Sequence, residues 1–443
     1  MNEQIKSAVL LSLVLLSLFL TYQLWFARKP EDRVIEDDYD NVYFEEPKPL
    51  QQFFIPERIF IYQDDLCYQL RHGDSHFALL WEGLSEMLQE IAEPANYEYG
   101  ENMPEDARLC LDLQFSPALP LGRESPWLKE APAGELARVQ IWRLDDRCWG
   151  VLQDEGDSAV LLLLPVRGGL KLAALCDQFN PEGRPPYEEL GAGELLLSQG
   201  TFISVPSPLY VPVHNGGMEN LTLQAEVLDR ELLLNTMFIN RNLVREIKER
   251  DGGLIFTDGE QGLRMGDGLE YSHPQLEQKP VVLSYTAALL TAGKLLGYYG
   301  GWPENLRLEL LARDDGAGAG SRGIYSAQWR SYFRGYPLIG GAGVAMSFHH
   351  GGLVSYRRNL YVLLYSTGDQ LYAQGYREAL EKAVDLLADA GVDHYWLEEM
   401  DLGYYLTRNS LQPQAVPVWA IRLNGRQLIL TAGELVSLEG FVP

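Results

Sequence analysis

The most uniform hydrophobic pattern lies near the N-terminus. From Ala8 to Phe26, nineteen consecutive residues include no charged side chain. At about 1.5 Å per residue, a helix of this length reaches roughly 28 Å, close to the ~30 Å of a bilayer hydrocarbon core. We therefore predict a cytoplasmic tail at 1–7 and an uncleaved transmembrane anchor at 8–27. A cleaved signal peptide and a buried core helix are the alternatives, and no A-x-A-like cleavage site supports the former.

An acidic segment follows this apolar run. Between Glu31 and Glu46, eight residues are acidic and one is basic. Such a segment repels itself and stays solvated, so 28–52 is predicted to be an acidic linker. A calcium loop is the alternative, but the run lacks alternating oxygen ligands and a central glycine. Because long domains translocate largely regardless of charge, we expect a cytoplasmic N-terminus and an extracytoplasmic body.

The next patterns predict an N-terminal α+β domain over 53–212. Apolar residues from Phe77 to Ile91 recur at helical spacing, with Asp74 or Ser75 as the N-cap. Strand-like apolar runs surround this helix. They occur at 59–62, 109–115, 137–144, 147–152 and 158–165.

Short apolar runs broken by turns predict a middle β-meander domain over 213–280. The turns are RDGG, GEQG and GDG, and a helix is predicted before them, around 228–238. Asp-Gly between apolar runs indicates a hairpin, because the turn needs residues that tolerate a positive φ.

A helix followed by strand-like runs occurs twice over 281–443. The first helix is predicted at 284–298 and the second at 372–390, each with glycine at its end. Each helix is expected to cover a small antiparallel meander. The predicted fold class is therefore α+β, with an N-terminal transmembrane helix and a three-domain extracytoplasmic body.

Composition and charge narrow the classes of function. The 443 residues are 46% hydrophobic and 22% charged, as in folded globular proteins. Lys and Arg total 36 against 62 Asp and Glu, a net charge of −26. So acidic a chain repels phosphate backbones, and we expect no nucleic-acid partner.

Candidate catalytic and metal-binding residues are not supported by their surroundings. The GxGxxG pattern at 318–323 does not open a helix. A helix start separates His72 from His76, so the two do not form a metal pair at i,i+4 spacing. Ser75, in GDSH, has no confident His and Asp partners, and Glu398-Glu399 would point to opposite faces of a strand. We predict no catalytic residue, no metal site and no cofactor.

All four cysteines fall within the predicted N-terminal domain. Outside the cytoplasm they could form two disulfides in three possible pairings, or remain as small buried hydrophobic residues. The sequence leaves both states open for Cys67, Cys110, Cys148 and Cys176.

Three segments carry a family resemblance: the anchor KSAVLLSLVLLSLFLTYQLW, the block 238–274 with its TDG-x-x-GL core, and the closing VPVWAIRL. They resemble the YycH family of membrane-bound regulators. The last helix–meander unit is also similar to PepSY-type modules. The resemblance implies a non-enzymatic regulator of a two-component system. Its implied partners are a cell-wall sensor histidine kinase of the WalK/YycG type and the sister regulator YycI, with a cell-membrane location.

The resemblance attributes contacts with these partners largely to transmembrane helices, and the predicted anchor offers one stripe for such a contact. Its Ser and Thr side chains are small and allow close approach and interhelical hydrogen bonds. The alternative is that they bond their own i−4 carbonyls. The stripe consists of Leu10, Val14, Ser17, Thr21 and Leu24.

Two other classes of function remain as alternatives. The PepSY-like tail would suit a membrane-tethered inhibitor or chaperone of an exported envelope enzyme. A cell-envelope hydrolase is the enzymatic alternative.

Overall fold

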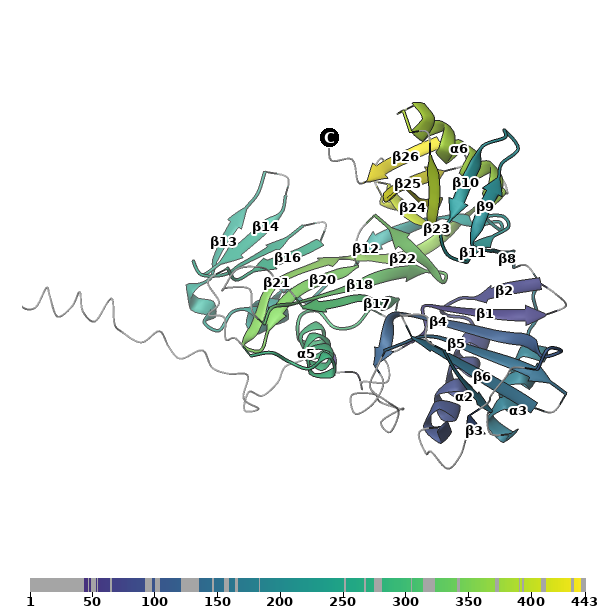
Figure 1. Cartoon of the computed structure of the whole chain (residues 1–443). Coiled ribbons are helices and arrows are strands. Elements are labelled where there is room, and N and C mark those ends of the chain that lie inside the picture. Colours follow the sequence, from purple (N-terminus) through teal and green to yellow (C-terminus); the bar gives the residue numbers. More distant parts are fainter. Residues whose placement is uncertain are drawn as a thin grey trace, which may run out of the picture.

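The computed structural model has an α+β fold in which β-strands predominate and three sheets can be distinguished (Figure 1). The predicted α+β class is thus confirmed, and the described part includes five α-helices. The structure describes residues 44–46, 48, 53, 55–63, 66–91, 98–99, 104–120, 135–145, 147–154, 159–163, 166–182, 184–250, 252–266, 268–274, 281–303, 305–313, 323–340, 343–370, 374–389, 391–392, 394–407, 412–431 and 434–439.

The first sheet has nine strands and is covered by α2 (Ser75–Ile91) and α3 (Val166–Asp177) (Figure 1). Its order is β11-β8-β2-β1-β4-β5-β6-β7-β3, and all pairings are antiparallel. The strands are β1 (Arg58–Gln63), β2 (Leu66–Leu70), β3 (Glu98–Tyr99), β4 (Arg108–Pro120), β5 (Glu135–Leu144), β6 (Arg147–Asp154), β7 (Ala159–Leu163), β8 (Pro186–Leu190) and β11 (Leu209–Pro212).

Helical spacing of leucines explains how α2 packs. Leu80, Leu84 and Leu88 are fully buried and share a core with Ile59 and Leu113 of the sheet. Burying each such side chain contributes about 1.5–3 kcal/mol. The predicted helix is confirmed.

The second sheet contains eight antiparallel strands in the order β13-β14-β15-β16-β21-β20-β18-β17. The predicted helix at 284–298 is α5 (Tyr285–Tyr298), and it begins after the N-cap Ser284, whose hydroxyl accepts the Ala287 N–H at 3.3 Å. A shorter helix, α4 (Arg230–Met237), precedes the sheet in the chain, as predicted. The strands are β13 (Arg245–Lys248), β14 (Leu254–Thr257), β15 (Gly262–Met265), β16 (Gly268–Ser272), β17 (Leu306–Arg313), β18 (Tyr325–Phe333), β20 (Val344–His349) and β21 (Gly352–Asn359).

The Asp-Gly signal in this sheet marks a real hairpin between β14 and β15. Gly259 has φ 101°, in the region that favours glycine. The Asp258 carboxylate accepts the Glu260 and Gln261 N–H groups, each at 3.0 Å. The turn is therefore held by its own side chain as well as by its backbone.

The third sheet is covered by α6 (Tyr376–Asp389). Its centre is the antiparallel run β23-β24-β25-β26. The β9–β10 hairpin joins it through a parallel pairing of β10 with β23, and β19 also pairs parallel with β23. The strands are β9 (Gly193–Leu196), β10 (Phe202–Val205), β12 (Glu219–Ala225), β19 (Tyr336–Ile339), β22 (Tyr361–Gln370), β23 (Tyr395–Thr407), β24 (Gln414–Leu423), β25 (Arg426–Thr431) and β26 (Glu434–Glu439).

One buried carboxylate ties three strands of the first sheet together. Asp112 on β4 is 0% exposed. It accepts a 2.9 Å hydrogen bond from Arg138 Nε on β5 and a 2.8 Å bond from the Tyr210 hydroxyl on β11. Burial and the neighbouring Asp112 both raise the pKa of Tyr210, so its hydroxyl remains a donor.

Candidate functional site

The three sheets meet at a polar cleft, which we call the junction cleft. One wall is formed by residues 57–58 and 69–72 of the first sheet, and another by β17 and β18. The third wall comes from β19 and from the strands β23 to β25. The cleft contains about 970 Å³ of free space, part of it open to solvent. The cavity volume itself is about 200 Å³, room for a ligand smaller than a drug-sized molecule.

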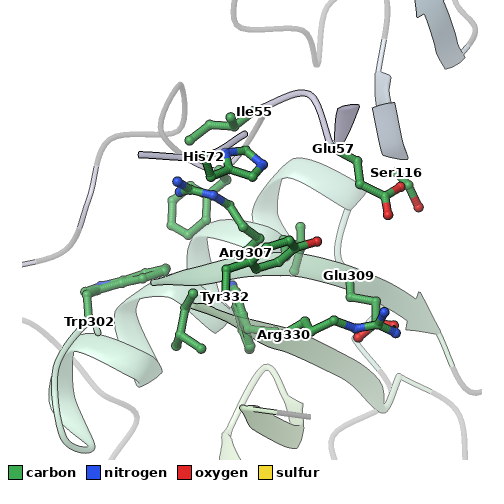
Figure 2. A pocket seen from close by; sticks show the side chains of 13 residues that line it. Ile55, Glu57, His72, Ser116, Trp302, Arg307, Glu309, Arg330 and Tyr332 are labelled. Carbon is green, nitrogen blue, oxygen red and sulfur yellow. The ribbon is translucent and has the colours of Figure 1, made fainter. Parts of the chain in front are cut away.

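A second hollow, which we call the His72 pocket, continues the cleft between the first two sheets (Figure 2). Its cavity volume is about 40 Å³, room for a small group, within about 550 Å³ of partly open free space. Trp302 and Trp329 contribute to its apolar lining, and Ser116 and Tyr332 contribute hydroxyl groups. Glu57, His72, Glu309 and Arg330 line both hollows.

His72 is almost completely buried at this pocket. The residue is only 8% exposed. The centroid of its ring lies 4.3 Å from that of Phe77 and 5.4 Å from that of Tyr332. Neither ring nitrogen makes a hydrogen bond of ordinary geometry. Burial lowers the pKa of His72 well below its usual value, and the Arg307 charge lowers it further, while the Glu57 backbone opposes this effect. The ring is therefore neutral at physiological pH.

Arg307 of β17 is the nearby cation. Figure 2 shows its guanidinium end directed toward the His72 ring, with Glu57 and Ser116 on the other side of the pocket. Within the described ranges Arg307 makes no ion pair, and its buried Nε has no hydrogen-bond partner. Burial lowers the pKa of Arg307, although a guanidinium stays protonated in proteins. A positive charge without a carboxylate partner thus faces the pocket.

The other charges of the pocket are compensated or weakened. Arg330 is paired with Glu309 on the neighbouring strand. Burial raises the pKa of Glu57 despite the opposing Arg58 charge, and the cations that act on Glu57 are Arg58 and Arg330 rather than Arg307. The negative groups therefore do not balance Arg307.

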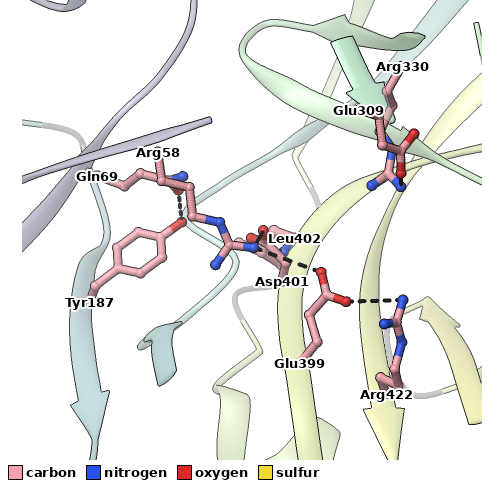
Figure 3. Close-up of polar contacts among 9 residues, drawn as sticks. All are labelled: Arg58, Gln69, Tyr187, Glu309, Arg330, Glu399, Asp401, Leu402 and Arg422. Atoms are coloured by element: carbon pink, nitrogen blue, oxygen red, sulfur yellow. Dashed lines mark hydrogen bonds and ion pairs between the residues drawn. The ribbon is translucent and has the colours of Figure 1, made fainter. Parts of the chain in front are cut away.

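An ion-pair chain crosses the junction cleft (Figure 3). Arg58 of the first sheet reaches Asp401 on β23 at 2.8 Å and Glu399 at 3.9 Å. Arg422 on β24 reaches Glu399 from the other side at 3.2 Å. Burial disfavours the Arg58 charge, but the carboxylates of Asp401, Glu57 and Glu399 outweigh it and raise the pKa of Arg58. The chain links the first and third sheets electrostatically.

Arg71 makes a contact of a different kind. Its guanidinium carbon lies 3.6 Å from the centroid of the Tyr336 ring, a cation–π distance. In the part of the chain that the structure describes, Arg71 has no carboxylate partner. Arg71 therefore lines the junction cleft without a carboxylate partner, while Arg307 lines the His72 pocket.

The structure separates the two histidines that the sequence brought to attention. His76 lies on α2 against Phe179, with ring centroids 5.8 Å apart, while His72 faces the pocket. Ser75 is the first residue of α2. No group of three or more His, Cys, Asp or Glu among the described residues is arranged to hold a metal ion.

The cysteines, whose state the sequence left open, are four buried free thiols. Burial raises the pKa of Cys67 to about 12 and that of Cys148 to about 11. Thiols with such pKa values are poor nucleophiles at neutral pH.

The predicted transmembrane stripe lies outside the described residues. Leu10, Val14, Ser17, Thr21 and Leu24 all precede residue 44, where the description begins. In the described ranges, no helix is long and apolar enough to cross a membrane.

Comparison with known proteins gives the family. Residues 3–123 match the model of the YycH protein, N-terminal domain. This part of the chain belongs to the YycH family. The predicted family membership is confirmed by this match, which includes the apolar segment 8–26.

Solved structures extend the likeness to the fold. A crystal structure of YycH from Bacillus subtilis covers 88% of this chain and 99% of its own, with 15% identity and a TM-score of 0.55. At this identity the likeness shows a shared fold. An uncharacterized protein from Eubacterium rectale covers 52% of this chain, with 14% identity and a TM-score of 0.35. No curated protein matches the chain.

Sequence reasoning missed the junction cleft because its residues come from distant segments. Arg58, Arg307 and Asp401 each occupy an ordinary position within a strand, and no local motif connects them. The available signal was weak: charged residues alternate with leucine in LRLELLAR, which contains Arg307.

Proposed function

We propose that the chain is a non-enzymatic, membrane-anchored regulator of a two-component system. It would modulate a cell-wall sensor histidine kinase of the WalK/YycG type, together with a YycI-like sister protein. The main support is the match of residues 3–123 to the YycH N-terminal domain, since that stretch includes the charge-free segment 8–26.

The proposed arrangement follows from the order of the segments. Residues 1–7 stay in the cytoplasm, 8–27 cross the membrane once, and the acidic linker 28–52 leads to an extracytoplasmic body. The body is proposed to comprise the units 53–212, 213–280 and 281–443. The stripe of Leu10, Val14, Ser17, Thr21 and Leu24 contacts the partner helices, and the body adds extracytoplasmic contacts.

The test replaces Ser17 and Thr21 together by Leu in the full-length protein. Loss of two interhelical hydrogen bonds at about 0.6 kcal/mol each weakens association roughly eightfold. Kinase-dependent transcription should change while the amount of displayed protein stays constant. The matched control is Ser12→Leu, which alters a hydroxyl on another face of the helix. Photocrosslinking from position 17 in intact membranes should capture the kinase or its sister regulator.

The same experiment separates the tethered-inhibitor alternative. An inhibitor or chaperone of an exported enzyme should still act when the anchor is replaced by a cleaved signal and the body is secreted. Unchanged transcription in the double variant, together with full function of the secreted body, would rule out contact through the membrane helix.

A further inference from the structure

We propose that the His72 pocket binds a small polar ligand through an oxyanion, a carboxylate or phosphate group, held by Arg307 and His72. As the input to a regulator this inference rests on the proposed function, but the binding itself does not depend on it. Three features of the pocket support this: unsatisfied donors, its charge balance and its position.

The pocket contains buried donors that lack hydrogen-bond partners. Buried polar groups in folded proteins are almost always hydrogen-bonded, and leaving one unpaired costs about 1–3 kcal/mol. Here the buried Nε of Arg307 has no partner, and neither ring nitrogen of the adjacent His72 makes a hydrogen bond of ordinary geometry, the Glu57 backbone being the one group that interacts with the ring. An oxyanion can accept hydrogen bonds from the Arg307 guanidinium and from the single N–H of the neutral His72 ring at once, so it would satisfy donors that the described residues leave unsatisfied.

The charges around His72 also favour an anion as the ligand. The groups that face His72 from the surrounding elements are Arg307 on β17, Tyr332 on β18 and Glu57 before β1. Glu57 interacts electrostatically with Arg58 and Arg330 rather than with Arg307. The Arg307 end of the pocket is therefore positive within a chain of net charge −26. Cations cannot replace the missing partner there, whereas an anion can.

The pocket also lies where a bound ligand would contact two sheets. The pocket opens into the junction cleft, because Ser116, Tyr332 and four other residues line both hollows. A ligand with its oxyanion at Arg307 would extend its polar body along Gln69 and Arg71. It would touch the first and second sheets at once, so its binding would favour one arrangement of the two.

The test is equilibrium dialysis of the full-length protein in nanodiscs, with radiolabelled acetate in one arm and inorganic phosphate in the other. We expect saturable binding of one of them, at one equivalent per chain. Arg307→Met removes a charge-assisted hydrogen bond and should weaken that binding about 10- to 100-fold. The matched control, Arg357→Met, changes an exposed arginine of β21 and should bind as the wild type does.

Two further variants keep the result interpretable. Arg307→Lys retains the charge and should bind more tightly than Arg307→Met, and His72→Asn should weaken binding without removing the cation. If neither anion binds saturably, or if Arg307→Met binds as well as the wild type, the inferred site is wrong. That outcome, with kinase-dependent transcription still sensitive to Ser17 and Thr21, would remove the ligand site and leave the proposed function standing.

Discussion

At the scale of single residues, burial decides how much an ion pair matters. Asp112 is fully buried between Arg138 and Tyr210, whereas the Asp177 side chain, paired with Arg143 at 2.8 Å, is 62% exposed. Removing one member of a buried pair leaves an uncompensated charge, while water replaces an exposed partner at little cost. Similar contact distances therefore predict different energies.

We expect Asp112→Ala to lower the free energy of unfolding by about 3 kcal/mol, at the low end for buried pairs because Arg138 keeps some access to water. Asp177→Ala is the control and should cost less than about 1 kcal/mol. Urea unfolding followed by tryptophan fluorescence measures both. Equal effects of the two substitutions would contradict the structural role assigned to Asp112.

His72 gives a prediction for pH. Its pKa is lowered in the folded state, while an unfolded chain titrates near about 6.5. Below that pH the unfolded state binds a proton that the folded state does not, so His72 destabilises the fold as pH falls. The slope reaches about 1.4 kcal/mol per pH unit. Between pH 7 and pH 5, we expect the stability of the wild type to fall by up to about 2 kcal/mol more than that of His72→Gln.

The control for this pH series is His350→Gln, since His350 is exposed at the turn between β20 and β21. Its pH dependence should follow that of the wild type. Glu57, with its raised pKa, has the opposite sign: its contribution is lost as pH rises above about 4.5. It is present in every variant and cancels in the comparison. Parallel curves for wild type and His72→Gln would show that His72 titrates normally.

At the scale of elements, the sequence correctly predicted the helices and hairpins whose sequence pattern lies within the element itself. The helices α2, α5 and α6 have apolar residues at helical spacing with a cap or a terminal glycine, and all three are present. The Asp258-Gly259 hairpin likewise depends only on its own residues. Local chemistry decides such elements, so reading the sequence is enough.

Elements that depend on distant partners were missed or left unassigned. The helix α3 starts with Gly168-Gly169 inside its first turn, a weak helical signal that packing against α2 and the first sheet overrides. The β9–β10 hairpin lies within 53–212, yet it pairs with β23 almost two hundred residues later in the chain. No periodicity within 193–205 identifies that partner, and the same reason explains why the junction cleft was not predicted.

At the scale of the whole molecule, the first and third sheets are joined by few but partly buried polar contacts. Arg58 and Asp401 are 16% and 17% exposed and lie 2.8 Å apart. The Tyr376 hydroxyl at the start of α6 donates to Glu188 on β8 at 2.9 Å. A few specific contacts of this kind hold the first and third sheets in their relative positions. Changing one of these contacts should therefore alter how the two sheets are arranged.

The pair Arg58–Asp401 allows this idea to be tested. Asp401→Leu removes the nearest paired carboxylate from Arg58 and leaves Glu57 and the more distant Glu399, and a double-mutant cycle with Arg58→Met should give a coupling energy of about 1–3 kcal/mol. The double variant should recover stability, because apolar side chains of similar size replace a buried pair well.

Spin labels at Glu182→Cys and Lys382→Cys, both exposed positions, should show a broader distance distribution in Asp401→Leu. The buried native thiols should not react with the label under the same conditions. Arg422→Met, which breaks a pair within the third sheet alone, should leave the distribution narrow. Broadening in both variants would mean that Arg58–Asp401 has no special part in joining the sheets.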